Sequence, residues 1–295
     1  MSNGLCVAAD RTTGARLVER SIFFACGAPK SGTTWLQRIL DAHPQIQCSG
    51  EGHFIERVSM PFARVLNDYA GHMKLVAESV YEGQPPYPPL VQADLDQVVR
   101  DFIISRLMTR NPGPEIRWIG DKTPRYSIEL PALQRLFPQA RFIHIVRDPR
   151  DVAVSRVHHT ARGGHQDRVA GEALVQFVRN AAQVWLETVK RVSDFTAKNP
   201  DVIHTVRYEA MLADPRGETR KMLRFLGADH DDALVDRISD ATSFEAMSGR
   251  KPGKEDPDSF LRKGVAGDWV GRLEPEVLAA LDETCGSAMR DWGYR

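Results

Sequence analysis

Short apolar runs recur along the chain, and each is bounded by glycine, proline or charged residues. These runs are residues 22–26 (IFFAC), 116–119 (IRWI), 141–146 (RFIHIV) and 202–206 (VIHTV). Apolar runs of this length are typical of strands that are covered on both faces. The pattern therefore predicts four short buried strands.

The segments between these runs carry apolar residues at the three- and four-residue steps of an amphipathic helix. After the first strand we expect a helix that is capped by Ser31 or Thr33 and ends before His43-Pro44. A second helix is predicted to begin at Asp148-Pro149, and a third to span residues 174–195. A fourth ends at Gly227, and a fifth spans residues 274–289. Strands that alternate with helices predict an α/β fold with a central parallel sheet flanked by helices on both faces.

Three segments lack such periodicity and are predicted to be irregular: residues 82–90, which hold four prolines, 160–168 and 249–259. Residues 52–110 are expected to form a mostly helical insertion. With neither an internal repeat nor a clear linker, we predict one domain over residues 1–295. Whether residues 249–262 are ordered without a ligand stays open.

Composition narrows the class of protein. The chain has 295 residues, and 39 Lys and Arg balance 39 Asp and Glu, which excludes a broadly basic nucleic-acid binder but not a local cationic pocket. No stretch approaches the ~20 apolar residues of a membrane span, and the N-terminus does not resemble a signal peptide. The four cysteines, Cys6, Cys26, Cys48 and Cys285, form no CxxC pair and are expected to be free thiols. We therefore predict a cytoplasmic protein.

The strongest local signal is a glycine-bearing loop between the first strand and its helix. Gly27 and Gly32 stand five residues apart, as in the ATP-binding loop G-x-x-x-x-G-K-[ST], so backbone N–H groups could surround an anion. Lys30 precedes the second glycine instead of following it, and hydroxyl residues come after it. This order favours a P-loop-like three-layer fold that binds a shorter phosphoanhydride, although a kinase with a variant loop stays open.

The segment PKSGTTW, residues 29–35, resembles the 5′-phosphosulfate loop of sulfotransferases that use 3′-phosphoadenosine 5′-phosphosulfate (PAPS). The resemblance implies PAPS as sulfate donor, 3′,5′-ADP (PAP) as product and no metal. It also implies which residues hold the 5′-phosphate and sulfate, namely Lys30, Ser31, Gly32, Thr33 and Thr34. Trp35 would stack on the adenine.

PAPS also carries a 3′-phosphate, so a second anion site is expected. Arg147 leaves a predicted strand and Ser155 follows eight residues later, the separation of the family's 3′-phosphate motif. Arg offers a planar fork for phosphate and Ser a short donor. Arg262-Lys263-Gly264 begins a segment similar to the family's RKGxxGDW, which closes over the same phosphate, and Asp268-Trp269 would anchor it.

Two further matches concern the nucleoside. Thr242 and Phe244 lie in a T-S-F segment, and Tyr208 in a Y-E pair, both of which resemble adenine-contacting segments of the family. The resemblance covers roughly residues 20–270.

Sulfuryl transfer needs a base for the acceptor proton and cations near the leaving phosphate. Lys30 suits the leaving oxygen, and Lys122 is expected to face the sulfuryl oxygens. Cytosolic sulfotransferases carry K-T-H with His as the base, but here Pro124 follows Lys122-Thr123. Glu51 resembles the glutamate base of tyrosyl-protein sulfotransferases; its ordinary pKa of about 4.3 keeps it ionised, and burial would raise it. His53 is the rival base.

The sequence thus predicts a PAPS-dependent enzyme that sulfates a hydroxyl or amine. The alternatives are a nucleotide-dependent kinase and a PAP-binding protein that has lost catalysis. A small-molecule acceptor is the first expectation, with carbohydrate or peptide tyrosine open. We expect no nucleic-acid or membrane partner, and a homodimer stays open.

Overall fold

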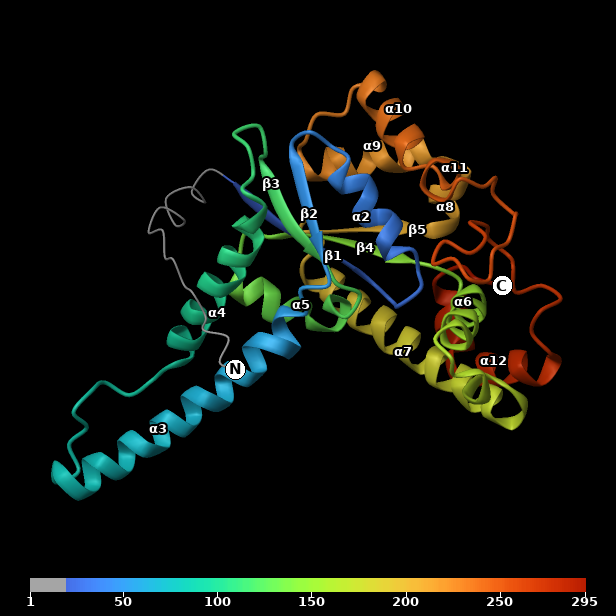
Figure 1. The fold of residues 1–295 in the computed structure, drawn as a ribbon. Helices are drawn as coiled ribbons and strands as arrows, with labels where there is room; N and C mark the ends of the chain where they lie inside the picture. The colour runs from blue at the N-terminus through green and yellow to red at the C-terminus, as the bar shows by residue number, and fades with distance from the viewer. Residues whose placement is uncertain (1–19) are drawn as a thin grey trace, which may run out of the picture.

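A five-stranded sheet forms the centre of the molecule. The computed structural model describes residues 20–295. All neighbouring strands run parallel, in the order β2-β3-β1-β4-β5 (Figure 1). The strands are β1 (Ser21–Gly27), β2 (Ile46–Gly50), β3 (Trp118–Lys122), β4 (Arg141–Val146) and β5 (Ile203–Arg207). The predicted parallel α/β architecture is confirmed.

Four of these strands lie at or near the predicted apolar runs. β4 has the predicted bounds, whereas β3 begins two residues later than predicted and includes the polar pair Asp121-Lys122. β2 was not predicted. It is a five-residue edge strand, IQCSG, which pairs only with β3 and includes polar residues, so it lacks the apolar run that marked the others.

Helices cover both faces of the sheet, and alternate side chains of β1 divide between them. Phe23 and Ala25 pack among α2, α8, α9 and α10, whereas Phe24 and Cys26 pack among α4, α5 and α7. The first group is α2 (Thr33–Asp41), α8 (Tyr208–Ala213), α9 (Pro215–Leu226) and α10 (Asp232–Ala241), and the second α4 (Gln92–Leu107), α5 (Tyr126–Leu136) and α7 (Gly171–Lys198). The predicted three layers are therefore present.

The remaining helices extend these layers. Near the end of β4 lie α6 (Pro149–Arg162), α11 (Phe244–Ser248) and α12 (Pro275–Asp291), of which α6 and α12 pack with α7 around the buried Trp185. Short turns of helix occur at 108–110 and 166–169. The prediction of an irregular 160–168 segment was therefore partly wrong, because α6 continues to Arg162 before the chain turns.

The ends of three helices test the capping residues that the sequence predicted. Asp148 caps α6, accepting a hydrogen bond from the Arg150 N–H at 2.9 Å, and Gly227 ends α9 at φ 68°, both as predicted. The prediction that Ser31 or Thr33 caps α2 was wrong. Gly32 occupies the cap position in the left-handed region, and no side chain accepts from the first turn.

The predicted helical insertion forms an arm. A π-helical turn, Ile55–Ser59, leads into α3 (Met60–Val80), which projects away from the sheet, and residues 81–91 return without helix to α4 (Figure 1). Within residues 20–295, no helix is both long and apolar enough to span a bilayer. Cys26, Cys48 and Cys285 are free and buried, as predicted, and Cys6 lies outside the described residues.

Candidate functional site

A cleft of about 760 Å³ lies beyond the carboxyl ends of the central strands, where ligands of parallel sheets bind. It collects most of the predicted site residues, which come from six separate segments of the chain. Those that line it are Lys30, Gly32, Thr33, Thr34, Trp35, Glu51, Arg147, Ser155, Tyr208, Thr242, Phe244, Arg262, Lys263 and Gly264. Ser31, His53 and Lys122 do not line it.

The loop between β1 and α2 forms one wall of this cleft. Gly32 has φ 96°, and a Cβ atom there would lie 2.7 Å from the Tyr208 ring, so only glycine fits. The helix start is uncapped, which leaves the first N–H groups of α2 free to bind an anion. Ser31 is buried below the loop, where its N–H donates to the Ala28 carbonyl at 3.0 Å.

Lys30 occupies the left-handed region as well, with φ 74°. Its Nζ lies 4.3 Å from the centre of the Phe260 ring. Burial, together with the nearby Arg162, Arg147 and Lys122 charges, lowers the pKa of Lys30 to about 8. The Lys30 ammonium therefore lies among other positive charges, and a bound anion would offset their mutual repulsion.

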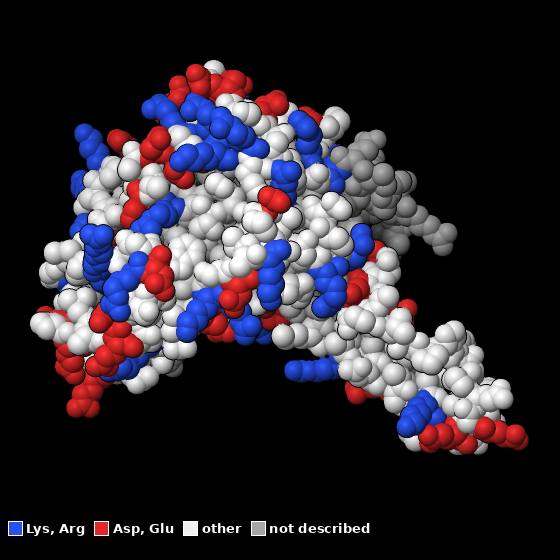
Figure 2. All heavy atoms as spheres, turned by 180° about the vertical axis from the view of Figure 1, so that it is seen from behind, with Lys and Arg blue, Asp and Glu red and all other residues white. Residues whose placement is uncertain are grey.

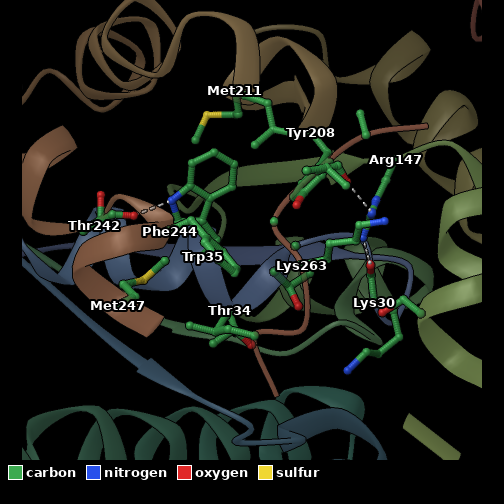
Figure 3. A pocket seen from close by; sticks show the side chains of 18 of the residues that line it. Lys30, Thr34, Trp35, Arg147, Tyr208, Met211, Thr242, Phe244, Met247 and Lys263 are labelled. Atoms are coloured by element: carbon green, nitrogen blue, oxygen red, sulfur yellow. Dashed lines mark hydrogen bonds between the residues drawn. The ribbon is translucent and has the colours of Figure 1, made fainter. Parts of the chain in front are cut away.

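Arg147 lies at the end of β4 with its side chain 10% exposed. Its guanidinium donates to the carbonyl oxygens of Lys30 at 3.3 Å and Val265 at 3.0 Å, and it lies over the Tyr208 ring (Figure 3). Its Nε is buried without a hydrogen-bond partner among the described residues. Asp151, 3.7 Å away, already accepts from two backbone N–H groups. The unpaired Nε fits an anionic ligand.

The other two cations expected at the 3′-phosphate already form ion pairs with acidic residues. Arg262 and Lys263 both form ion pairs with Asp268, and Arg262 also contacts Glu255 at 2.6 Å. Asp268 therefore holds this segment in place, as the anchor role requires. Gly264 has φ 66°, and a Cβ there would lie 2.3 Å from the Phe244 ring, so the segment passes directly over that ring.

The opposite end of the cleft is aromatic and apolar. The Trp35 Nε1 donates to the Thr242 carbonyl at 2.9 Å, and the Trp35 and Tyr208 rings meet edge to face at 5.7 Å. Phe244 and Met247 lie near the Trp35 indole, far from Lys30 (Figure 3). A flat heteroaromatic ring fits here by stacking, while the Trp35 N–H is held by the protein.

Glu51 lies where β2 ends, and its N–H donates to the Lys122 carbonyl at 2.8 Å. Its carboxylate pairs with Lys122 and lies 3.2 Å from His53 Nε2. The Glu51 side chain is 53% exposed and faces the open side of the cleft. Behind it, His53 Nδ1 lies 2.8 Å from Glu56.

The backbone around these groups is strained. Among residues 20–295, five non-glycine residues have positive φ, and three of them are Lys30, Glu51 and His53. Such conformations cost about 1–3 kcal/mol each and persist only where the surroundings impose them. Strain that coincides with three candidate catalytic residues marks this part of the cleft as functional.

A buried carboxylate imposes the strained turn. Asp121 accepts from the Gly52 N–H at 3.1 Å and from the hydroxyls of Thr123 and Tyr126, both at 2.8 Å. Burial raises the pKa of Asp121. These bonds fix Gly52, and with it the directions of Glu51 and His53.

Phe260, Met211 and Met247 at the cleft carried no sequence signal. Phe260 and His159 lie beside Lys30, and Met211 and Met247 line the apolar end. Isolated aromatic or sulfur side chains without a motif resemble ordinary core positions. His144 on β4 is fully buried, and burial lowers its pKa to about 3. Within residues 20–295 no group of three or more His, Cys, Asp or Glu is arranged to hold a metal ion.

Comparisons with known proteins agree with this geometry. Residues 23–232 match the sequence model of the Sulfotransferase family. The chain is 25% identical to human Sulfotransferase 1C2, covering 88% of this chain and 79% of that one. It is also 25% identical to zebrafish Protein-tyrosine sulfotransferase 1, in a match that covers 87% of this chain and 67% of that one. The fold is similar to that of mouse sulfotransferase SULT7A1 solved with PAP, with a TM-score of 0.58 and 22% sequence identity. The match covers 93% of this chain and 85% of that one.

Proposed function

Because the chain belongs to the Sulfotransferase family, we propose that its cleft binds PAPS and transfers the sulfuryl group to a hydroxyl or amine, releasing PAP. One observation carries the proposal. The cleft places two separate cationic positions, Lys30 with the uncapped α2 terminus and Arg147 with Ser155, on one side of an aromatic end. That is the arrangement an adenosine with phosphates on both its 3′ and 5′ oxygens requires.

Each position has a defined task in this proposal. Lys30 and the N–H groups from Gly32 to Thr34 hold the 5′-phosphate, and Lys30 stabilises the charge that grows on the leaving oxygen. Arg147 and Ser155 hold the 3′-phosphate, with Lys263 and Gly264 above them. Trp35 and Phe244 flank the adenine, beside Tyr208 and Thr242. PAPS supplies the activated sulfuryl group.

Glu51 is the better base of the two candidates. It lines the cleft, whereas His53 lies behind it, between Glu51 and Glu56. The carboxylate therefore reaches an acceptor first, and its contacts with Lys122 and His53 hold it in one direction. Lys122 does not itself line the cleft, so we propose that it holds this carboxylate directly and faces the sulfuryl oxygens from behind it.

The acceptor enters from the open side near Glu51, Phe260 and His159. We propose a small-molecule hydroxyl as the acceptor class, with peptide tyrosine as the alternative, since relatives named as sulfotransferases and as protein-tyrosine sulfotransferases match the chain comparably well. A cytoplasmic location is proposed from the free, buried cysteines and from a relative named Cytosolic sulfotransferase 17 of Arabidopsis thaliana.

Binding without a divalent cation separates this function from phosphoryl transfer. We expect PAP to bind with equal affinity in EDTA and in Mg²⁺, because protein cations alone neutralise its phosphates. Titration calorimetry of PAP and ATP under both conditions measures this. ATP binding that is tight only with Mg²⁺, together with absent PAP binding, would favour a kinase. Transfer of radiolabelled sulfate from PAPS to an acceptor library then separates an enzyme from an inactive PAP-binding protein.

The lowered pKa of Lys30 predicts a pH-dependent affinity. Lys30 is charged below about pH 8 and neutral above it, so PAP should bind more weakly as the pH rises through this value. A bound anion favours the charged form, so binding near this pH should take up a proton. Calorimetry in two buffers of different ionisation enthalpy, from about pH 6.5 to about 9.5, measures both.

The Lys30→Arg variant is the control, because a guanidinium stays charged over this range. Its affinity should change little with pH and its binding should take up no proton. A wild-type protein whose profile is as flat as that of the variant would contradict the assignment of Lys30 to the phosphate.

A further inference from the structure

The arm formed by α3 and α4 carries an unusual share of exposed apolar surface. Of the 14 large hydrophobic side chains that the described residues expose, 11 lie between Met60 and Phe102. Figure 2 shows the arm as a separate lobe whose surface is mostly uncharged, with acidic and basic groups gathered toward its tip. Apolar surface concentrated in this way marks an interaction site.

The described part of the chain, residues 20–295, covers α3 poorly. Ala77 alone among the 21 residues of α3 is buried, and an aromatic contact joins Phe62 to Phe102 on α4 at 6.5 Å. Helices gain most of their stability by packing an apolar face against another element. A long projecting helix with one buried residue therefore needs a further partner.

Six positions on α3 form a stripe along one face of the helix, and the symmetry of their spacing indicates which partner would cover it. Positions 61, 65, 69, 72, 76 and 80 are separated by 4, 4, 3, 4 and 4 residues, so they share one face of α3. Five of the six are exposed, among them Val65 at 62% and Val80 at 65%. The spacing is the same from either end. An antiparallel second copy would therefore place position 65 against 76 and position 69 against 72, on a two-fold axis.

The charges beside the stripe are centred on residue 71, within one residue of the centre of the stripe. Arg64, Asp68, Lys74 and Glu78 are exposed, and none forms an ion pair or side-chain hydrogen bond with another described residue. Antiparallel pairing about residues 70 and 71 brings Arg64 near Glu78 of the second copy and Asp68 near its Lys74. Parallel pairing in register would bring like charges together. The four charges sum to zero, which gives no attraction to an anionic membrane.

We propose that this arm is a homodimer interface in which α3 pairs antiparallel with α3 of a second copy. The cleft lies outside the arm, so the proposal stands independently of the proposed reaction. Sedimentation velocity of the full chain should show a dimer at micromolar concentration. Val65→Glu, which places a charge in the stripe opposite Val76 of the second copy, should raise the dissociation constant at least tenfold.

A charge-swap series tests the orientation. Arg64→Glu and Glu78→Arg should each weaken the dimer, because each places like charges together twice per dimer, and the double variant should restore the wild-type dissociation constant. Circular dichroism and PAP binding of each variant report whether the fold is intact. A wild-type protein that is monomeric throughout, or that dimerises equally well with Val65→Glu, would overturn the proposal.

Cross-linking tests the register. In a Cys6→Ser background, the Val65→Cys/Val76→Cys double variant should form a covalent dimer with a short bis-maleimide, whereas each single variant should not. The remaining cysteines are buried. Cross-linking of both single variants would mean a parallel pair and would overturn the antiparallel arrangement. Flotation with anionic vesicles in place of dimer formation would assign the arm to a membrane surface instead.

Discussion

Replacing Glu51 by Gln should lower turnover by roughly 10²–10⁴-fold, the usual contribution of a positioned general base, while PAP binding remains near the wild-type affinity. The amide keeps the size of the side chain but cannot accept the acceptor proton. The sheet fixes the backbone of Lys122 at the end of β3, and the amide oxygen of the variant can still accept a hydrogen bond from its ammonium. The loss should therefore appear in kcat and little in the affinity for PAP. Single-turnover sulfate transfer and calorimetry measure the two quantities separately.

The His53→Gln variant separates the two candidate bases. His53 contacts Glu51 and Glu56 but does not line the cleft, so its loss should reduce turnover less than the Glu51→Gln change. Glu187→Gln, on the exposed face of α7, is the matched control and should leave turnover unchanged. Near-normal turnover in Glu51→Gln, with a large loss in His53→Gln, would transfer the role of base to the histidine.

Replacing Arg147 by Ala should remove most of the preference for PAPS over adenosine 5′-phosphosulfate, which lacks the 3′-phosphate. Truncating a buried, hydrogen-bonded charge costs about 2–5 kcal/mol. That corresponds to a loss of roughly 30-fold to several thousand-fold in discrimination. The effect should be confined to PAPS, because the shorter nucleotide has no group for Arg147 to bind. Comparing kcat/KM for the two donors in each protein gives the ratio directly.

Two variants make the result interpretable. Arg147→Lys keeps the charge but loses the planar fork, so it should recover only part of the discrimination. Arg179→Ala removes an exposed arginine that pairs with Glu283 on α12, away from the cleft, and should leave the ratio unchanged. A ratio that is the same in Arg147→Ala and wild type would show that the 3′-phosphate binds elsewhere.

The sequence predicted those parts of the molecule that depend on contacts between near neighbours. The buried strands, the Asp148 cap and the Gly227 end all follow from residues a few positions apart, and the structure contains them. β2 depends on a long-range pairing with β3 and has little apolar signal of its own. The capping prediction at Ser31 or Thr33 failed because the helix start is kept open toward the cleft.

The candidate site was predictable as a set of residues but not as an arrangement. The motifs named Lys30, Arg147 and most of the cleft lining. They also named Asp268 as the anchor of its segment, where it pairs with Arg262 and Lys263, but they gave no indication that Phe260 covers Lys30. The contact between Phe260 and Lys30 joins residues that lie far apart in the sequence, which short-range patterns do not determine.

The left-handed backbone at Lys30, Glu51 and His53 has a consequence for any attempt to improve the protein's heat resistance. Glycine adopts this conformation without the Cβ clash, so substitution by glycine at these positions would relieve local strain. A screen that rewards survival at high temperature alone would accumulate such changes and drift toward a robust but inert scaffold. Directed evolution of this chain therefore needs selection on turnover in every round.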